Sequence, residues 1–136
     1  MRIIPSASRS FVPAGHESPL SPGVLKKVLL EKADLQPGRI QMVNWAKLGV
    51  GKRFARHYHE EMQEVFILVQ GEAEITVGTE TAALRRGDTV VIDPREVHQM
   101  RNTGAEAVVY LAIGITSETE GKTVVVERFK PSPSDE

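Results

Sequence analysis

The chain has 136 residues, a formal net charge of −1 and no cysteine. That length suits one domain with its own hydrophobic core, and the balanced charge gives no reason to expect a nucleic-acid or anionic-membrane partner. The absence of thiols excludes disulfides, thiolate zinc sites and cysteine nucleophiles. The first residues lack the apolar core of a secretory signal, and no apolar run approaches the length of a membrane span, so a soluble cytoplasmic protein is expected.

Residues 1–23 are rich in serine, proline and glycine, which predicts an irregular arm that lies over the body of the protein or pairs with another subunit. His16 lies in this arm and is expected to be a solvated or capping residue. At the other end, residues 130–136 have the polar composition of a disordered tail. Residues 24–129, between the arm and the tail, form the predicted folded domain.

From residue 24 onward, short apolar runs alternate with glycine and proline, and no stretch has the sustained period of a helix. Residues 107–115 are strongly apolar, which predicts a strand that is covered on both faces. Many short strands at regular spacing are typical of an all-β sandwich or barrel. In chain order, strands are expected over 24–31, 40–48, 57–59, 64–70, 71–78, 88–93, 97–102, 107–115 and 123–129.

Four candidate metal ligands stand out among these strands. His57 and His59 are two residues apart on one strand, so their side chains should project to the same face. A tight turn then lets Glu64, at the start of the return strand, reach the same side. His98 lies on a later strand, where its face is shared with Met100. Imidazole and carboxylate ligands suit one divalent transition metal such as Mn, Fe, Ni, Zn or Cu.

The spacing of these residues resembles two motifs of the cupin superfamily. The first motif, G-x5-H-x-H-x3,4-E-x6-G, is matched at every position, by Gly51, His57, His59, Glu64 and Gly71. The second, G-x5-P-x-G-x2-H-x3-N, is matched at its outer positions, by Gly87, His98 and Asn102. Asp93 stands where the motif has proline and Arg95 where it has glycine, so the turn before the last histidine is expected to differ in shape.

The resemblance implies a single cupin jelly-roll β-barrel, also called a double-stranded β-helix. It further implies that the two histidines of the first motif, its glutamate and the histidine of the second motif bind one metal inside the barrel. Glu64 is in addition a candidate proton shuttle. The same resemblance implies a homodimer, to which the apolar segments 24–30 and 123–129 would contribute by extending a sheet across the interface.

Two further residues are candidates for contact with a substrate. Arg53 has the strand parity of His57 and is a candidate for binding a substrate carboxylate, although a solvated arginine fits the pattern as well. Met100 is the methionine most suited to lining a substrate cavity, because it follows His98 on the same face. Core packing is the simpler expectation for the other methionines and the large aromatic residues, which are Met42, Met62, Trp45, Phe66 and Tyr110.

Gln41 and Asn44 fall on opposite faces of one predicted strand, so at most one of them is expected to face the interior.

For function, the resemblance implies a metal-dependent enzyme that acts on a small organic molecule. Dioxygenase, isomerase, decarboxylase and lyase chemistry are all open, with a dioxygenase-like oxidoreductase or an isomerase favoured. The alternative is a metal-containing module that binds or senses a small molecule without turnover. Neither reading requires a nucleic acid or a membrane.

Overall fold

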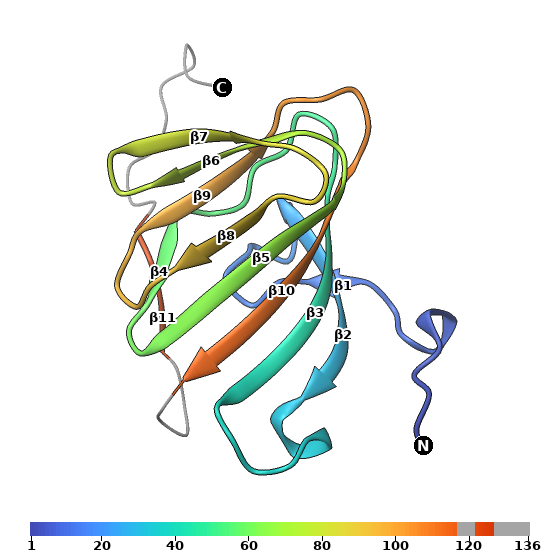
Figure 1. The fold of residues 1–136 in the computed structure, drawn as a ribbon. Coiled ribbons are helices and arrows are strands. Elements are labelled where there is room, and N and C mark those ends of the chain that lie inside the picture. The colour runs from blue at the N-terminus through green and yellow to red at the C-terminus, as the bar shows by residue number, and fades with distance from the viewer. Residues whose placement is uncertain (117–121, 127–136) are drawn as a thin grey trace.

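The computed structural model describes residues 1–116 and 122–126, and its strands form two antiparallel sheets that face each other (Figure 1). One sheet has six strands in the order β1-β2-β3-β10-β5-β8, and the other has five in the order β11-β4-β9-β6-β7. This is the predicted all-β jelly roll. The strands are β1 (Val12–Pro13), β2 (Val24–Glu31), β3 (Ile40–Leu48), β4 (His57–His59), β5 (Met62–Gln70), β6 (Ala73–Val77), β7 (Glu80–Leu84), β8 (Thr89–Ile92), β9 (His98–Asn102), β10 (Val108–Thr116) and β11 (Thr123–Val125).

Two strands depart from the prediction. β7 was not expected, because its residues are small and mostly exposed and give no apolar alternation. β1 pairs with the first residues of β2, so the arm contributes a short edge strand. The only helices among the described residues are two 3-10 turns, η1 (Ser6–Ser8) and η2 (Lys32–Asp34), and no helix there is long and apolar enough to cross a membrane. The predicted tail 130–136 and the end of the last predicted strand, 127–129, lie outside the described residues.

β4 and β5 do not form the hairpin that the sequence suggests. β4 lies between β11 and β9 in the five-stranded sheet, whereas β5 lies between β10 and β8 in the six-stranded sheet. The turn between them therefore carries the chain from one sheet to the other. As a result, Glu64 meets His57 and His59 from the opposite sheet, across the interior of the barrel, and not from a neighbouring strand.

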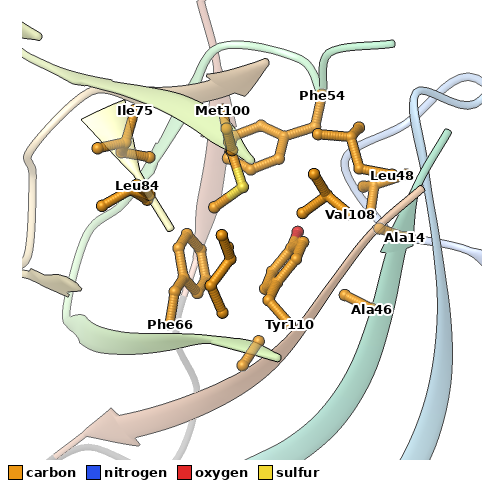
Figure 2. Packing of buried hydrophobic residues seen from close by; sticks show 14 of the residues in the cluster. Ala14, Ala46, Leu48, Phe54, Phe66, Ile75, Leu84, Met100, Val108 and Tyr110 are labelled. Atoms are coloured by element: carbon orange, nitrogen blue, oxygen red, sulfur yellow. The ribbon is translucent and has the colours of Figure 1, made fainter. Parts of the chain in front are cut away.

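Large side chains fill one part of the barrel (Figure 2), where Phe66, Tyr110 and Met100 lie close together. Phe66 and Tyr110 are buried, as predicted. Met100 is fully buried within this core. Along β5, β10 and β3, successive inward residues become smaller on the central strand, because Tyr110 is followed by Ala112 and then by Gly114. The core therefore gives way to an open space at the end of the barrel where Glu64 lies.

The outer face of the six-stranded sheet is apolar and only half buried in the described chain. Trp45, predicted to pack in the core, lies on this outer face in register with Leu111, and that prediction is wrong. The expectation that residues 107–115 are covered on both faces also fails for the single chain, because the outward side chains of β10 stay partly exposed. Two cross-strand rows carry apolar side chains on this face: Trp45, Leu111 and Ile67, between Lys27 and Thr89, in one, and Leu30, Val43, Ile113, Val65 and Val91 in the other.

Candidate metal centre

Four buried polar side chains meet in the interior of the barrel. His57 and His59 come from β4, Glu64 from β5 and His98 from β9, and one ligand atom from each lies within 4.8 Å of all the others. β4 and β9 pair at His57 and His98, which brings those two rings to a centroid distance of 4.4 Å. The predicted alternation on β4 is confirmed, because both histidines are buried while the tyrosine between them is half buried on the other face.

Each of the three imidazole rings is held through its Nδ1 atom. In His57 and His98, Nδ1 lies 2.6 and 2.9 Å from the backbone carbonyl oxygen two residues earlier, and it donates to that oxygen. In His59, Nδ1 lies 2.8 Å from the hydroxyl oxygen of Thr123 on β11. When Nδ1 carries the proton, Nε2 presents its lone pair to the centre of the cluster. This is the tautomer and orientation that a metal-binding histidine needs.

The protonation of the cluster follows from its burial. Burial lowers the pKa of His57 to about 3, and nearby His16 and His98 add to the effect, so the His57 ring is neutral. For Glu64, burial alone would raise the pKa, but the close contacts with the rings of His59 and His98 outweigh it and hold the pKa of the carboxyl well below its usual value. The centre therefore combines a carboxylate with a neutral imidazole.

The contacts around Glu64 test whether this set fits a metal ion. Its Oε1 atom lies 2.7 Å from Nε2 of His59 and 3.2 Å from Nε2 of His98. A neutral ring that donates from Nδ1 has no proton on Nε2, so these close approaches of lone pairs require a proton or a cation between them. Nε2 of His59 is also buried without a hydrogen-bond partner. A divalent metal satisfies both conditions, and the four residues can bind one.

The cluster opens into a cavity of about 670 Å³. His59 and Glu64 form part of its wall, and Tyr110 and Ala112 of β10 also line it. Gly114 is required there, because a Cβ atom would approach the Met42 side chain to 3.1 Å and the Met62 sulfur more closely. Residues of β2 and β3 also line the cavity, among them Lys26, Val28, Glu31, Gln41, Met42 and Asn44.

The family model of the cupin domain matches residues 44–114 of this chain, which include the whole ligand cluster. The chain belongs to the cupin family. An uncharacterised protein of Methanocaldococcus jannaschii is 27% identical to this cupin over 71 residues, which are 52% of this chain and 57% of that protein. The chain thus spans little more than half the length of this curated relative.

Solved structures of other proteins share the fold of this cupin. A predicted oxalate decarboxylase of Thermotoga maritima has a TM-score of 0.74 and 22% identity, over 85% of this chain and 99% of that one. A sugar phosphate isomerase of Silicibacter pomeroyi has a TM-score of 0.73 and 18% identity, over 93% and 83% of the two chains. The polyketide cyclase RemF of Streptomyces resistomycificus has a TM-score of 0.72 and 12% identity, over 93% and 87%. At these identities the likeness shows the fold alone.

The two predicted substrate residues of this cupin lie away from the cavity. Arg53 is exposed and does not line it, because residues 54–56 are not part of β4 and the parity of the strand does not extend back to it. Phe54 points into the core instead and is 1% exposed. Met100 packs in the core and not on the cavity wall, which is lined by Met42 and Met62.

Gln41 and Asn44 both line the cavity, so the expectation that at most one would face inward is wrong. The cause is a β-bulge in β3. Gly114 pairs with Met42 while the next residue of β10 pairs with Ile40, and this leaves Gln41 as an extra residue without a partner. An extra residue breaks the period of two and turns its side chain to the face of its neighbour.

The turn before His98 has a left-handed backbone at the position where the motif has glycine, although arginine stands there. Arg95 has a φ of 70°, the left-handed conformation in which glycine is favoured. Its N–H donates to the carbonyl oxygen of His59 at 2.7 Å, and this ties the turn to β4. Asp93 accepts a hydrogen bond from Gln63 at 2.9 Å. The altered residues are exposed and do not line the cavity, so they bear on the backbone of the turn and not on the cavity chemistry.

The arm contributes two residues, Glu17 and His16, that no sequence motif pointed to. The buried carboxylate of Glu17 accepts hydrogen bonds from the backbone N–H groups of Gly23, Val24 and Ala55 at 2.9, 3.0 and 3.0 Å. Burial would raise the pKa of this carboxyl, but the nearby His16 ring and the hydrogen bonds from the backbone lower it overall. Gly23 is needed for the approach, because a Cβ atom there would lie 2.6 Å from the Glu17 carboxylate.

His16, carried by the anchored arm, lies over the metal cluster. Its ring stacks on that of His57 with a centroid distance of 3.8 Å and an angle of 20°. Its side chain is 15% exposed and lines the cavity, so the expectation of a solvated residue is wrong. Only its residue type could have marked His16 in the sequence. Its position depends on Glu17, which anchors the arm to backbone groups up to 38 residues away, and such contacts leave no local pattern.

Proposed function

We propose that this cupin is a metal-dependent enzyme that acts on a small organic molecule. The observation that carries the proposal is that the ligand cluster borders an open cavity, with His59 and Glu64 lining its wall. Structural metal sites are closed by protein ligands, whereas catalytic sites keep a position that a substrate can reach. A cavity of about 670 Å³ also has the size expected of a small-molecule site.

The residues of the cluster have separate tasks in this proposal. His57 and His98 are about 1% exposed and serve to hold the ion from within the protein. Glu64 is the one carboxylate of the cluster and faces the cavity, so a ligand oxygen beside it can transfer a proton to it. A bound divalent ion would supply a Lewis acid or a redox centre for a substrate oxygen. His16 covers His57 on the cavity side and limits the access of water.

A dioxygenase-like oxidoreductase or an isomerase is the favoured reaction class, with decarboxylase and lyase chemistry as further members of the proposal. The structures that share this fold are named for different reactions, so the fold does not select among them. The second candidate function is a metal-containing module that binds or senses a small molecule. The same cavity supports it, and turnover separates the two.

Metal content and turnover test the proposal. Protein purified without a metal-affinity tag is expected to contain close to one equivalent of transition metal by elemental analysis. The double variant His57→Ala, His98→Ala should lose it, whereas His16→Ala should keep it, because His16 is not one of the four ligands. Metal retained by the double variant would contradict the assignment of these residues as metal ligands. Oxygen consumption and product mass with candidate substrates then distinguish the enzyme from a module that binds without turnover.

We also propose that the chain forms a homodimer through the outer face of the six-stranded sheet. The two apolar rows on this face leave Trp45 and Ile113 half exposed in the single chain. A flat apolar surface pairs well with its own copy about a two-fold axis. Segment 24–30 lies in the same sheet, and β1 covers only its first part.

Light scattering should give twice the chain mass for the wild type and the chain mass for Trp45→Arg. Thr81→Arg, on the other sheet, is the control and should remain dimeric, and a monomeric wild type contradicts the proposal.

A further inference from the structure

The polar atoms that lack partners are concentrated around the cavity. Four buried side-chain atoms have no hydrogen-bond partner in the described part of the chain: Nδ1 of His16, Nε2 of Gln41, Oδ1 of Asn44 and Nε2 of His59. Two of them face a carboxylate oxygen, Nδ1 of His16 at 3.4 Å from Glu17 and Nε2 of His59 at 2.7 Å from Glu64. All four belong to residues that line this one cavity. Buried polar groups are normally satisfied, so unsatisfied atoms that share a cavity point to something that occupies it. The metal accounts for the atom of His59, and Glu17 faces the atom of His16, so the amide pair of β3 is left unexplained.

The two amides offer one acceptor and one donor. Asn44 is 7% exposed, and its Nδ2 atom contacts only the Met42 sulfur, a weak acceptor, at 3.1 Å, while its Oδ1 atom remains free. Gln41 presents a free Nε2 donor beside it, as a result of the bulge in β3. A hydroxyl group both donates and accepts, so it can satisfy either atom. A carboxylate, which only accepts, would leave Oδ1 of Asn44 without a donor.

The distance between this wall and the metal cluster suits a small ligand. Glu64 and Met42 lie in one cross-strand row, separated by Gly114 on the strand between them. Asn44 lies in the next row, separated from Phe66 by Ala112. Two strand spacings amount to about 9–10 Å. The Met42 and Met62 side chains lie over Gly114, so the room is in the row of Asn44, where the middle strand has the small residue Ala112. A molecule of several heavy atoms can therefore lie between the two walls.

Lys26 adds a positive charge to the wall with the amides. It lines the cavity from β2, and it belongs to none of the four ion pairs found among the described residues. The next residue, Lys27, faces outward, where its ammonium contacts the carbonyl and hydroxyl oxygens of Ser6 at 3.2 and 3.1 Å. A lysine at a cavity without a carboxylate partner favours an anionic ligand.

We propose that the cavity binds a small hydroxy acid, with its carboxylate at Lys26 and a hydroxyl group at Gln41 and Asn44. This inference names the substrate class for the function proposed above and rests on that function for the role of the metal. The ligand is of about three to six carbons, a size set by the space between the two walls. Binding at the amides and the lysine requires no metal, so it can be measured in metal-free protein.

Calorimetric titration of chelator-treated protein tests the class with three matched sets of compounds. Each hydroxy acid is compared with an acid that lacks hydroxyl groups and with an uncharged polyol: glycerate with propionate and glycerol, tartrate with succinate and erythritol, and gluconate with hexanoate and sorbitol. At least one hydroxy acid should bind about tenfold or more tightly than both of its analogues, because it alone satisfies the lysine and the amides. Absence of binding for all three hydroxy acids, or equal binding of an analogue, overturns the proposal.

Variants then assign the contacts. Lys26→Met should weaken binding of the hydroxy acid about tenfold or more and leave the polyol unaffected, whereas Lys27→Met, its outward-facing neighbour, should change neither. Gln41→Leu should remove the preference for the hydroxylated acid, and Gln70→Leu, on the surface, should preserve it. Unchanged binding in Lys26→Met overturns the proposal. Failure of the metal proposal appears separately, as protein that binds the hydroxy acid but contains no metal or shows no turnover.

Discussion

The two walls of the cavity differ in how many of their polar atoms have partners within the protein. On the metal wall, the rings of His57, His59 and His98 are each fixed by a partner at Nδ1, and their free atoms converge on one point. On the opposite wall, Gln41 and Asn44 keep free atoms that converge on no protein group. Ligand atoms that converge on one point suit a metal ion, which is spherical. A set of spaced donors and acceptors suits a molecule, which supplies the missing hydrogen bonds.

The difference also separates the electrostatics of the two walls. The metal wall contains groups that exchange protons, and burial sets their charge. The amides of the opposite wall are neutral at any ordinary pH, and Lys26 is a half-buried residue of the cavity lining. Acid should therefore act on the first wall and spare the second, which gives the largest effect expected here.

The free energy of unfolding of the metal-free protein should fall by several kcal/mol as the pH falls from about 6.5 to about 3. The pKa of His57 is about 3 in the folded state against 6.5 for an unperturbed histidine. Below pH 6.5 the unfolded chain takes up a proton that the folded chain excludes, so the stability is fully present above that pH and is lost below it, at up to about 1.4 kcal/mol per pH unit. Urea unfolding at stepped pH measures the slope.

Two variants isolate the source of that slope. His57→Asn keeps a donor for the carbonyl of Ala55 but cannot titrate, so its stability should fall less steeply with acid than that of the wild type. Asn44→Leu, on the opposite wall, should keep the full slope. An identical pH profile in His57→Asn and the wild type would show that burial of this ring does not cause the acid sensitivity.

The two walls also differ in how far the sequence predicts them. His57, His59 and His98 could be chosen because strand alternation and motif spacing are local properties, although the sequence did not show that Glu64 comes from the opposite sheet. The opposite wall depends on long-range register. Gln41 faces inward only because β3 has an extra residue against β10, and no residue near it signals the bulge. Trp45 was predicted to pack in the core but faces outward. Arg53 was a candidate for the cavity but does not line it, because it precedes β4.

The arm joins the two walls at the mouth of the cavity, and Glu17 should be its main anchor. Glu17→Gln should lower the free energy of unfolding by about 3 kcal/mol, because an amide cannot accept all three backbone N–H bonds and leaves a buried donor unsatisfied. Denaturant titration measures the loss. Glu74→Gln, a half-exposed partner of Arg101, should cost less than about 1 kcal/mol and is the control. Equal effects of the two substitutions would contradict the anchoring role.

The hydroxyl group of Thr123 tests how far the metal wall depends on the partners of its ligands. Thr123→Val keeps the shape of the side chain and removes the acceptor for Nδ1 of His59. Metal affinity, measured by competition with a chelator, should fall about 10–100-fold. Thr76→Val, which removes a hydroxyl contact with Thr81 on the surface, should leave the affinity unchanged. Undiminished affinity in Thr123→Val would mean that the ring is oriented by packing alone.

The smallest effect is expected at the turn that leads into the metal wall. Arg95 is the only described residue other than glycine with a positive φ. Arg95→Gly should raise the free energy of unfolding by about 0.5–1 kcal/mol, because relief of the left-handed strain exceeds the entropy that glycine adds to the unfolded chain. The hydrogen bond from its N–H to His59 is retained. Arg86→Gly, at a turn residue without positive φ, should give no gain. If Arg95→Gly destabilises the protein or weakens metal binding, the arginine side chain itself supports the metal wall, and the departure from the motif is then functional and not only tolerated.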